Sequence, residues 1–202
     1  MTEKTYYEEL LEYGVPDTLP KDSFAFEDLF DEFYVKDCGK TWSHDRNKSV
    51  GASEAFGCMR KSWFGKRAIR SGLARRGLDL IMEGEDQETI VDGLSSATLD
   101  GLIIDPTGAK LPADFLSLYG IEDLDADSVV LEMKSFDPRI NIAQEKAIHR
   151  GQTQMQMGLI RETTDYKPDF AVVMYVNASW LDDVRCFVVP FDENVYQMGR
   201  QR

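Results

Sequence analysis

An apolar stretch that ends on an acid and a lysine places the strongest constraint on how this chain folds. Residues 128–134 read SVVLEMK, a β-branched run typical of a buried strand, and it closes on Glu132 and Lys134. Because side chains alternate along a strand, we expect these two residues on one face and Met133 on the other. Charged groups at the end of a buried strand are costly to desolvate, which indicates that they serve a purpose.

A second acid stands in a comparable position. Asp100 lies in SATLDGLII, residues 96–104, a strand-like segment in which an aspartate is unfavourable. Two carboxylates at neighbouring strand ends suit a divalent cation, and oxygen ligands favour Mg²⁺ or Mn²⁺. Such a cation polarises a phosphate and activates a bound water, while Lys134 would orient that water or stabilise the transition state. We therefore predict a metal site formed by Asp100 and Glu132.

A long helix is predicted over residues 141–161, and it carries the motif HRGQTQMQM. His149, Gln152 and Gln156 stand at i, i+3 and i+7 in it, so they share one helix face. An amide can hydrogen-bond a nucleophile, a phosphate or a metal-bound water without competing for protons. The alternative is a polar outer face without a chemical role. Beside the two acids we favour a role in the site, with His149 and Gln156 as supporting residues.

The composition is that of a single-domain globular protein. Its 202 residues can bury one stable core, and no apolar run approaches the ~20 residues of a membrane span. The acidic, tyrosine-rich start is unlike a signal peptide, so we expect a cytoplasmic protein without a membrane partner. Cys38, Cys58 and Cys186 are too widely spaced for a metal knuckle or a disulfide framework, and we expect free thiols.

The net charge of −13 argues at first against a nucleic-acid partner, but the charge is unevenly distributed. Residues 60–76 hold bases and no acid, with Trp63 and Phe64 among them. The bases are Arg60, Lys61, Lys66, Arg67, Arg70, Arg75 and Arg76. Ser53 is a suitable cap for a helix over 54–66 that leads into this segment. A solvated face is the alternative, but the clustered arginines and their aromatic neighbours favour contact with phosphates.

The remaining segments complete an α/β pattern. Five more of them read as strands: 78–84, 88–93, 96–104, 170–176 and 186–189. The last two are joined by a polar connector that suggests a hairpin, and residues 105–127 form an acidic insertion. The order of helix, strands, long helix and two strands predicts a mixed central sheet flanked by helices.

We divide the chain into an N-terminal arm over residues 1–50 and a main domain over 51–202. The arm is acidic, and its apolar stripes predict short helices at 4–13 and 24–35, followed by a polar loop at 36–50. Such stripes usually face a core, so we expect the arm to pack on the main domain. A partner-binding arm and an acidic mimic of DNA charge are the alternatives.

Taken in order, these motifs resemble those of the PD-(D/E)xK nuclease superfamily. Within it the chain looks most like the RecB-like and lambda-exonuclease-like group, and closest to the YqaJ-type viral recombination exonucleases. SATLDGLI looks like the family's Asp-Gly strand, LEMKSF like its Glu-x-Lys strand and GQTQMQM like its glutamine helix. VGASEAFGCMRKSWF is similar to the family's first helix, which approaches DNA. The resemblance covers about residues 50–190.

The resemblance implies a restriction-endonuclease-like core and an Mg²⁺- or Mn²⁺-dependent deoxyribonuclease. Such enzymes are often exonucleases that act on ends of linear duplex DNA, in phage-type recombination or DNA processing. Carried over by position, Asp100 and Glu132 are the metal ligands, and Lys134 and Gln152 are the catalytic lysine and the active-site glutamine. The residues expected to contact DNA are Ser53, Arg60, Lys61, Lys66, Arg67 and Arg70. A single-strand annealing protein and a homo-oligomer are further implied partners.

Two departures from the family pattern bear on cofactors. Relatives usually carry another acid before the Asp-Gly strand, whereas residues 66–77 hold none. Either Glu83 or Glu88 replaces it, or a second metal is missing, or a segment of the natural chain is absent there. Some relatives also bind an iron–sulfur cluster through three or four cysteines, and with the three widely spaced cysteines of this chain we expect no cluster.

Two rival functions stay open at this point. A structure-specific or non-specific endonuclease would use the same chemistry on another DNA substrate. A catalytically impaired module that binds DNA or protein is the alternative from a different class, and the missing acid and the charge of −13 favour it.

Overall fold

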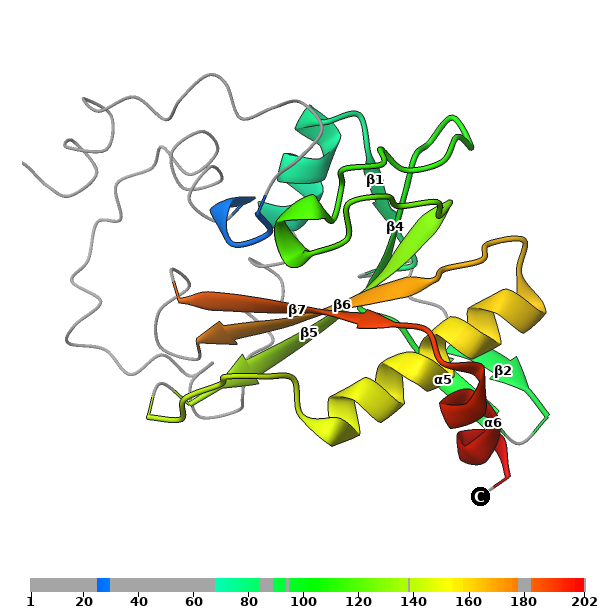
Figure 1. Cartoon of the computed structure of the whole chain (residues 1–202). Coiled ribbons are helices and arrows are strands. Elements are labelled where there is room, and N and C mark those ends of the chain that lie inside the picture. Colours follow the sequence, from blue (N-terminus) through cyan, green and yellow to red (C-terminus); the bar gives the residue numbers. More distant parts are fainter. Residues whose placement is uncertain are drawn as a thin grey trace, which may run out of the picture.

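The structure, a computed structural model shown in Figure 1, describes six stretches of the chain. These are residues 25–29, 68–83, 89–93, 95–137, 139–177 and 183–201. Several predicted features lie outside them: the helices at 4–13 and 54–66, the loop at 36–50, and Ser53, Arg60, Lys61, Lys66, Arg67 and Glu88. Within the described stretches, no helix is long and apolar enough to cross a membrane.

A five-stranded mixed sheet forms the centre of the fold, in the order β1-β4-β5-β6-β7. Its strands are β1 (Asp79–Ile81), β4 (Gly101–Ile104), β5 (Ser128–Phe136), β6 (Phe170–Asn177) and β7 (Val184–Pro190). β5 and β6 run parallel, and the other neighbouring pairs are antiparallel. The mixed sheet flanked by helices that the sequence predicts is therefore confirmed, and β6 and β7 form the expected antiparallel pair.

Helix α5 (Ala147–Thr163) covers one face of the sheet (Figure 1). It lies between β5 and β6 in the chain and supplies the crossover that a parallel pair requires. Helix α6 (Glu193–Arg200) packs against it, as does a separate two-stranded ribbon of β2 (Thr89–Asp92) and β3 (Ser95–Thr98). This face therefore carries two helices and the ribbon.

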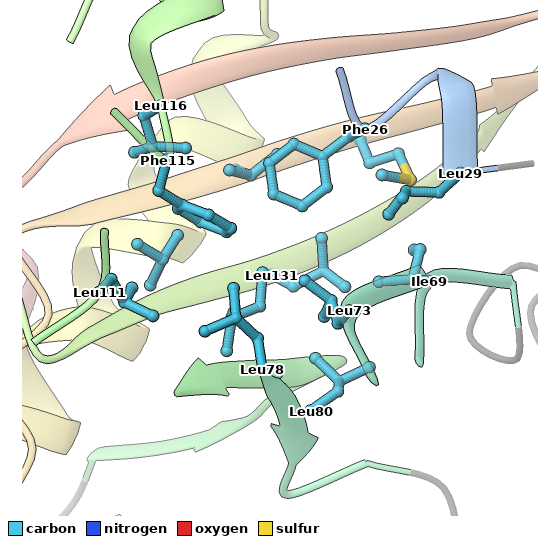
Figure 2. Close-up of a cluster of buried hydrophobic side chains, with 14 of the residues drawn as sticks. Phe26, Leu29, Ile69, Leu73, Leu78, Leu80, Leu111, Phe115, Leu116 and Leu131 are labelled. Atoms are coloured by element: carbon cyan, nitrogen blue, oxygen red, sulfur yellow. The ribbon is translucent and has the colours of Figure 1, made fainter. Parts of the chain in front are cut away.

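The opposite face carries the helical residues 68–75, the segment 25–29 and the short 3-10 helix η3 (Ser117–Tyr119) (Figure 1). A hydrophobic core lies between these elements and the sheet, and Figure 2 shows its side chains. Its labelled members are Phe26, Leu29, Ile69, Leu73, Leu78, Leu80, Leu111, Phe115, Leu116 and Leu131. Four of them come from the acidic insertion at 105–127 or from β5, so that insertion is part of the core-forming structure.

Alternation along β5 decides which of its side chains meet which face. Val129 and Leu131 belong to the core in Figure 2, whereas Val130 belongs to the core beneath α5. Met133 also packs against the first core, so Glu132 and Lys134 lie on the α5 face. This is the alternation that the sequence predicts.

Glu27 ties the segment 25–29 to the sheet. Its Oε2 accepts a hydrogen bond of 2.6 Å from the Tyr119 hydroxyl, and its Oε1 accepts one of 3.0 Å from the backbone N–H of Cys186. Phe26 and Leu29, on either side of it, are fully buried. Burial, the nearby charge of Glu27 and its hydrogen bond raise the pKa of the Cys186 thiol, which keeps it protonated.

The largest departures from the predicted elements concern the strand at 96–104, the start of the long helix and the C-terminal residues. The strand expected over 96–104 breaks at Leu99 and Asp100 into β3, which pairs only with β2, and β4, which joins the main sheet. β4 must lie close against β1, because a Cβ on Gly101 would stand 2.6 Å from Leu80 Cδ1. The chain therefore leaves the ribbon and enters the sheet at Asp100.

Helix α5 begins at Ala147, six residues later than the predicted start at residue 141. Arg185 Nη1 on β7 donates to Asn141 Oδ1 at 2.7 Å and to the Ile142 carbonyl at 2.9 Å, which holds this segment outside the helix. The C-terminal residues, for which the sequence analysis predicts no element, form α6. Asp192 caps that helix by accepting from the backbone N–H groups of Asn194 and Val195.

Candidate functional site

Asp100 and Glu132 face each other across the junction of β4 and β5. The last pair of the two strands is Gly101↔Leu131, so Asp100 directly precedes β4 where Glu132 follows Leu131 on β5. The charge of Asp100 acts on Glu132, which shows that the two carboxylates are neighbours. Asp100 Oδ2 accepts a hydrogen bond of 2.9 Å from the backbone N–H of Met133. The Asp100 carboxylate therefore binds β5 just beyond the end of its pairing with β4, at the residue that follows Glu132.

Glu132 is 1% exposed and receives hydrogen bonds from three predicted site residues. The Lys134 ammonium group contacts Oε1 from the same strand. Gln152 Nε2 donates to Oε1 at 2.9 Å, and Gln156 Nε2 donates to Oε2 at 2.6 Å, both from α5. The structure thus brings together Asp100, Glu132, Lys134, Gln152 and Gln156 at one place on the α5 face of the sheet.

Burial raises the pKa of the Glu132 carboxyl, and the neighbouring charge of Asp100 raises it further. The hydrogen bonds from Lys134 and Gln156, and the Lys134 charge, act in the opposite direction. Two carboxylates held this close, with one of them desolvated, form a site that favours an added proton or cation.

Gln156 has a fixed orientation and an unused acceptor. Its Nε2 donates to Glu132 and, at 3.1 Å, to the carbonyl of Thr98. A flipped amide would turn Oε1 toward these two acceptors, so the observed orientation is the favourable one. Gln156 Oε1 is buried and has no hydrogen-bond partner among the residues that the structure describes. An orphaned acceptor of this kind points to a donor, such as a bound water, that completes the site.

His149 contacts Tyr175 of β6 instead of Glu132. Its Nδ1 lies 2.7 Å from the Tyr175 hydroxyl, which also accepts a hydrogen bond of 2.9 Å from the backbone N–H of Lys146. Tyr175 pairs in register with Lys134, so the histidine stands next to the lysine end of the site. Sequence reasoning missed Tyr175, for which the only signal was a tyrosine within the aliphatic run FAVVMYVN.

Arg70 is the one predicted DNA contact within the described residues. Its side chain is 53% exposed and its Nη1 lies 3.1 Å from Glu83 Oε1. Glu83, which the sequence offered as a replacement for the missing acid, is therefore paired with an arginine and mostly buried. The site as described rests on two carboxylates, those of Asp100 and Glu132.

The residues present suit a hard divalent cation that keeps part of its water shell. Among the described residues, no group of three or more His, Cys, Asp or Glu side chains gathers to hold a metal. Mg²⁺ is commonly held by one or two carboxylates together with waters and substrate oxygens, so Asp100 and Glu132 are a sufficient donor set. Their mutual repulsion and the unpartnered Gln156 Oε1 fit a cation with bound water.

No family model and no curated protein matches this chain. A solved structure titled "Crystal structure of SSO0001" is similar over 96% of this chain and 82% of that chain, at 13% sequence identity and a TM-score of 0.33. A similarity of that size assigns neither a fold family nor a function. The description of the site therefore rests on its own residues.

Proposed function

We propose that this chain is a metal-dependent deoxyribonuclease built on a restriction-endonuclease-like core. It hydrolyses phosphodiester bonds of linear duplex DNA as an exonuclease, in phage-type recombination or DNA processing. The observation that carries the proposal is the facing pair Asp100 and Glu132, with Lys134 and two α5 glutamines on Glu132. A buried carboxylate surrounded by donors and opposed by a second acid is expensive in a purely structural role.

Asp100 and Glu132 would hold Mg²⁺ or Mn²⁺, which supplies Lewis-acid activation of the scissile phosphate and of a water nucleophile. Glu132 Oε1 already contacts Lys134 and accepts from Gln152, so a cation that binds this oxygen would displace one of these donors. Asp100 is anchored by its bond to the Met133 N–H, which holds the second carboxylate in place. The chain thus contributes a preorganised pair of oxygen donors.

Lys134 and Gln152 supply positive charge and hydrogen-bond donors beside these acids. The Lys134 ammonium is partly exposed and stabilises negative charge as it develops on the phosphate oxygens. Gln152 Nε2 is fixed on Glu132 Oε1, so its amide lies where it can orient a water or a phosphate. Gln156 keeps Glu132 in place from the buried side.

Surface charge supports a local contact with DNA despite the net charge of −13. Arg70 is half exposed and Arg75 is exposed on the helical residues 68–75, within the run of bases at 60–76. Phosphate contact by a confined basic surface is compatible with an acidic protein, because short-range contacts decide local binding.

The decisive experiment follows the digestion of end-labelled linear duplex DNA with Mg²⁺ or Mn²⁺, with a chelated sample as control. Glu132→Ala and Lys134→Ala should each abolish digestion, because they remove a cation ligand and the charge that stabilises the transition state. Glu122→Ala, at an exposed acid remote in sequence from the site, is the matched control and should digest DNA like the unmodified protein.

Closed circular duplex DNA as a substrate distinguishes an exonuclease from an endonuclease. An exonuclease leaves the circle intact while the linear form disappears, whereas degradation of both at similar rates shows an endonuclease. Circular dichroism confirms that each variant is folded. Full digestion by folded Glu132→Ala and Lys134→Ala would show that the site assignment is wrong, and binding of DNA without any turnover would identify a non-catalytic module.

A further inference from the structure

The contact between His149 and Tyr175 determines which imidazole nitrogen carries the proton. Burial, with the charges of Lys134 and Lys146, lowers the pKa of His149, so the ring is neutral at pH 7. A neutral imidazole has one donor nitrogen and one acceptor nitrogen. The assignment then depends on the hydrogen bonds of the Tyr175 hydroxyl.

Tyr175 is 1% exposed, and its hydroxyl oxygen already accepts a hydrogen bond from the backbone N–H of Lys146. Its own hydrogen needs an acceptor, and within the described part of the chain His149 Nδ1 is the one it meets, at 2.7 Å. If Nδ1 carried the proton, the tyrosine hydrogen would be buried without a partner, which is unfavourable. Tyr175 therefore donates to Nδ1, and the proton of the ring is on Nε2.

The position of the ring brings that donor to the site. His149 stands one turn before Gln152 on the α5 face that contacts Glu132, and Tyr175 is the register partner of Lys134. The two ring nitrogens point in different directions, so Nε2 faces away from the buried hydroxyl. The ring is partly exposed, and its one hydrogen bond in the described structure is the one at Nδ1.

We propose that His149 is a substrate-binding residue whose Nε2–H donates to a phosphate oxygen of the DNA strand at the Lys134 end of the site, and that Tyr175 is the positioning residue that holds this tautomer. This inference rests on the proposed nuclease function. The Lys134 ammonium attracts the phosphate by its charge, and the neutral His149 donor adds a hydrogen bond that fixes the orientation of the phosphate. A neutral donor at this point binds phosphate without adding charge repulsion against Lys134.

The tautomer is tested by nuclear magnetic resonance on the ¹⁵N-labelled full chain. His44 is the only other histidine, so a His44→Gln background leaves a single imidazole to observe. The expected spectrum shows a protonated Nε2 and an unprotonated Nδ1. In Tyr175→Phe the ring loses its fixed partner and both tautomers should appear. A spectrum with Nδ1 protonated in the unmodified site overturns the inference, whatever the enzymatic activity.

The substrate contact is tested by the KM and kcat for digestion of linear duplex DNA with Mn²⁺. His149→Phe keeps the ring against Tyr175 but removes both nitrogens, and it should raise KM about tenfold through loss of one hydrogen bond to a charged group. Tyr175→Phe lets part of the rings leave the binding tautomer, so KM should rise, by at most about twofold. In the His149→Phe background, Tyr175→Phe should change KM no further.

The outcomes separate this inference from the proposed function. If the unmodified chain digests DNA and folded His149→Phe has an unchanged KM, the contact of His149 with phosphate is wrong and the nuclease proposal stands. If His149→Phe does not fold, an unchanged KM in Tyr175→Phe is the overturning result. If the unmodified chain neither binds nor digests DNA, the proposed function fails and this inference fails with it.

Discussion

Gln156 donates to Glu132 Oε2 at 2.6 Å, while its own Oε1 is buried and meets no partner in the described part of the chain. The residue is held by its two donor bonds, to Glu132 and to the carbonyl of Thr98, and not by any acceptor role. Its side chain therefore links the candidate site to the end of the β2–β3 ribbon. That link can be tested by removing the amide while keeping the volume.

Replacing Gln156 by Met should lower the free energy of unfolding by about 1–3 kcal/mol, because the buried Glu132 carboxylate and the Thr98 carbonyl lose their donor. Urea denaturation measures this change. Gln197→Met is the matched control, since Gln197 is exposed and donates to Glu193 on the surface of α6, and its effect should stay within about 0.5 kcal/mol. Equal effects at the two positions would contradict the proposed link.

Asp100 should tolerate Asn far better than Ala in terms of stability. Asn keeps an oxygen that accepts the Met133 N–H and removes the charge that raises the pKa of Glu132. Ala leaves that N–H without its acceptor, so we expect it to be about 1–3 kcal/mol less stable than Asn. Urea denaturation at neutral pH compares the two variants. Both should lose Mn²⁺-dependent digestion of DNA, and equal stability of both would show that the hydrogen bond is unimportant.

Two glycines of α5 should respond to Ala in opposite directions. A Cβ at Gly158 would overlap the ring of Tyr196, so Gly158→Ala should destabilise the α5–α6 contact by about 1–3 kcal/mol. Gly151 has open space around its Cα, so Gly151→Ala should stabilise the helix by about 0.5–1 kcal/mol. Chemical denaturation of the two variants checks the sign. A Gly158→Ala variant as stable as the unmodified protein would mean that α6 does not pack as described.

Stability should depend on pH through His149. Its pKa is lowered below the ordinary value of 6.5, mainly by burial, so the unfolded chain binds the proton more readily than the folded one. The corresponding stability is present above the unfolded pKa and is lost as pH falls through the folded pKa. Denaturation of the protein from about pH 8 to about pH 5 should show this loss. His149→Gln should flatten that part of the profile, and an unchanged slope would contradict the assignment.

Local patterns predicted the strands and the long helix well, since β5 and β6 have apolar runs that leave little choice. They also placed Glu132 and Lys134 on one face, because alternation along a strand is a local property. The start of α5 was missed because Arg185, distant in sequence, binds Asn141. Periodicity contains no information about such a contact.

The site shows the same division between local and distant information. The helical spacing of His149, Gln152 and Gln156 put all three on one face, yet only the fold decides which partner each meets. Gln152 and Gln156 reach Glu132, while His149 reaches Tyr175, a residue from another strand. In contrast, α6 had a readable local signal, because Asp192 is a favourable cap directly before its first turn.

The break between β3 and β4 has a consequence for how the site communicates with its surroundings. Thr98, the last residue of β3, and Glu132 share the same amide donor on Gln156, so this side chain connects the ribbon to the main sheet. A ligand that binds Glu132 should therefore also alter the hydrogen bond between Gln156 and the Thr98 carbonyl of the ribbon. The rate of amide hydrogen exchange in β2 and β3 should therefore change when a ligand occupies the site, so it measures ligand binding even without DNA cleavage.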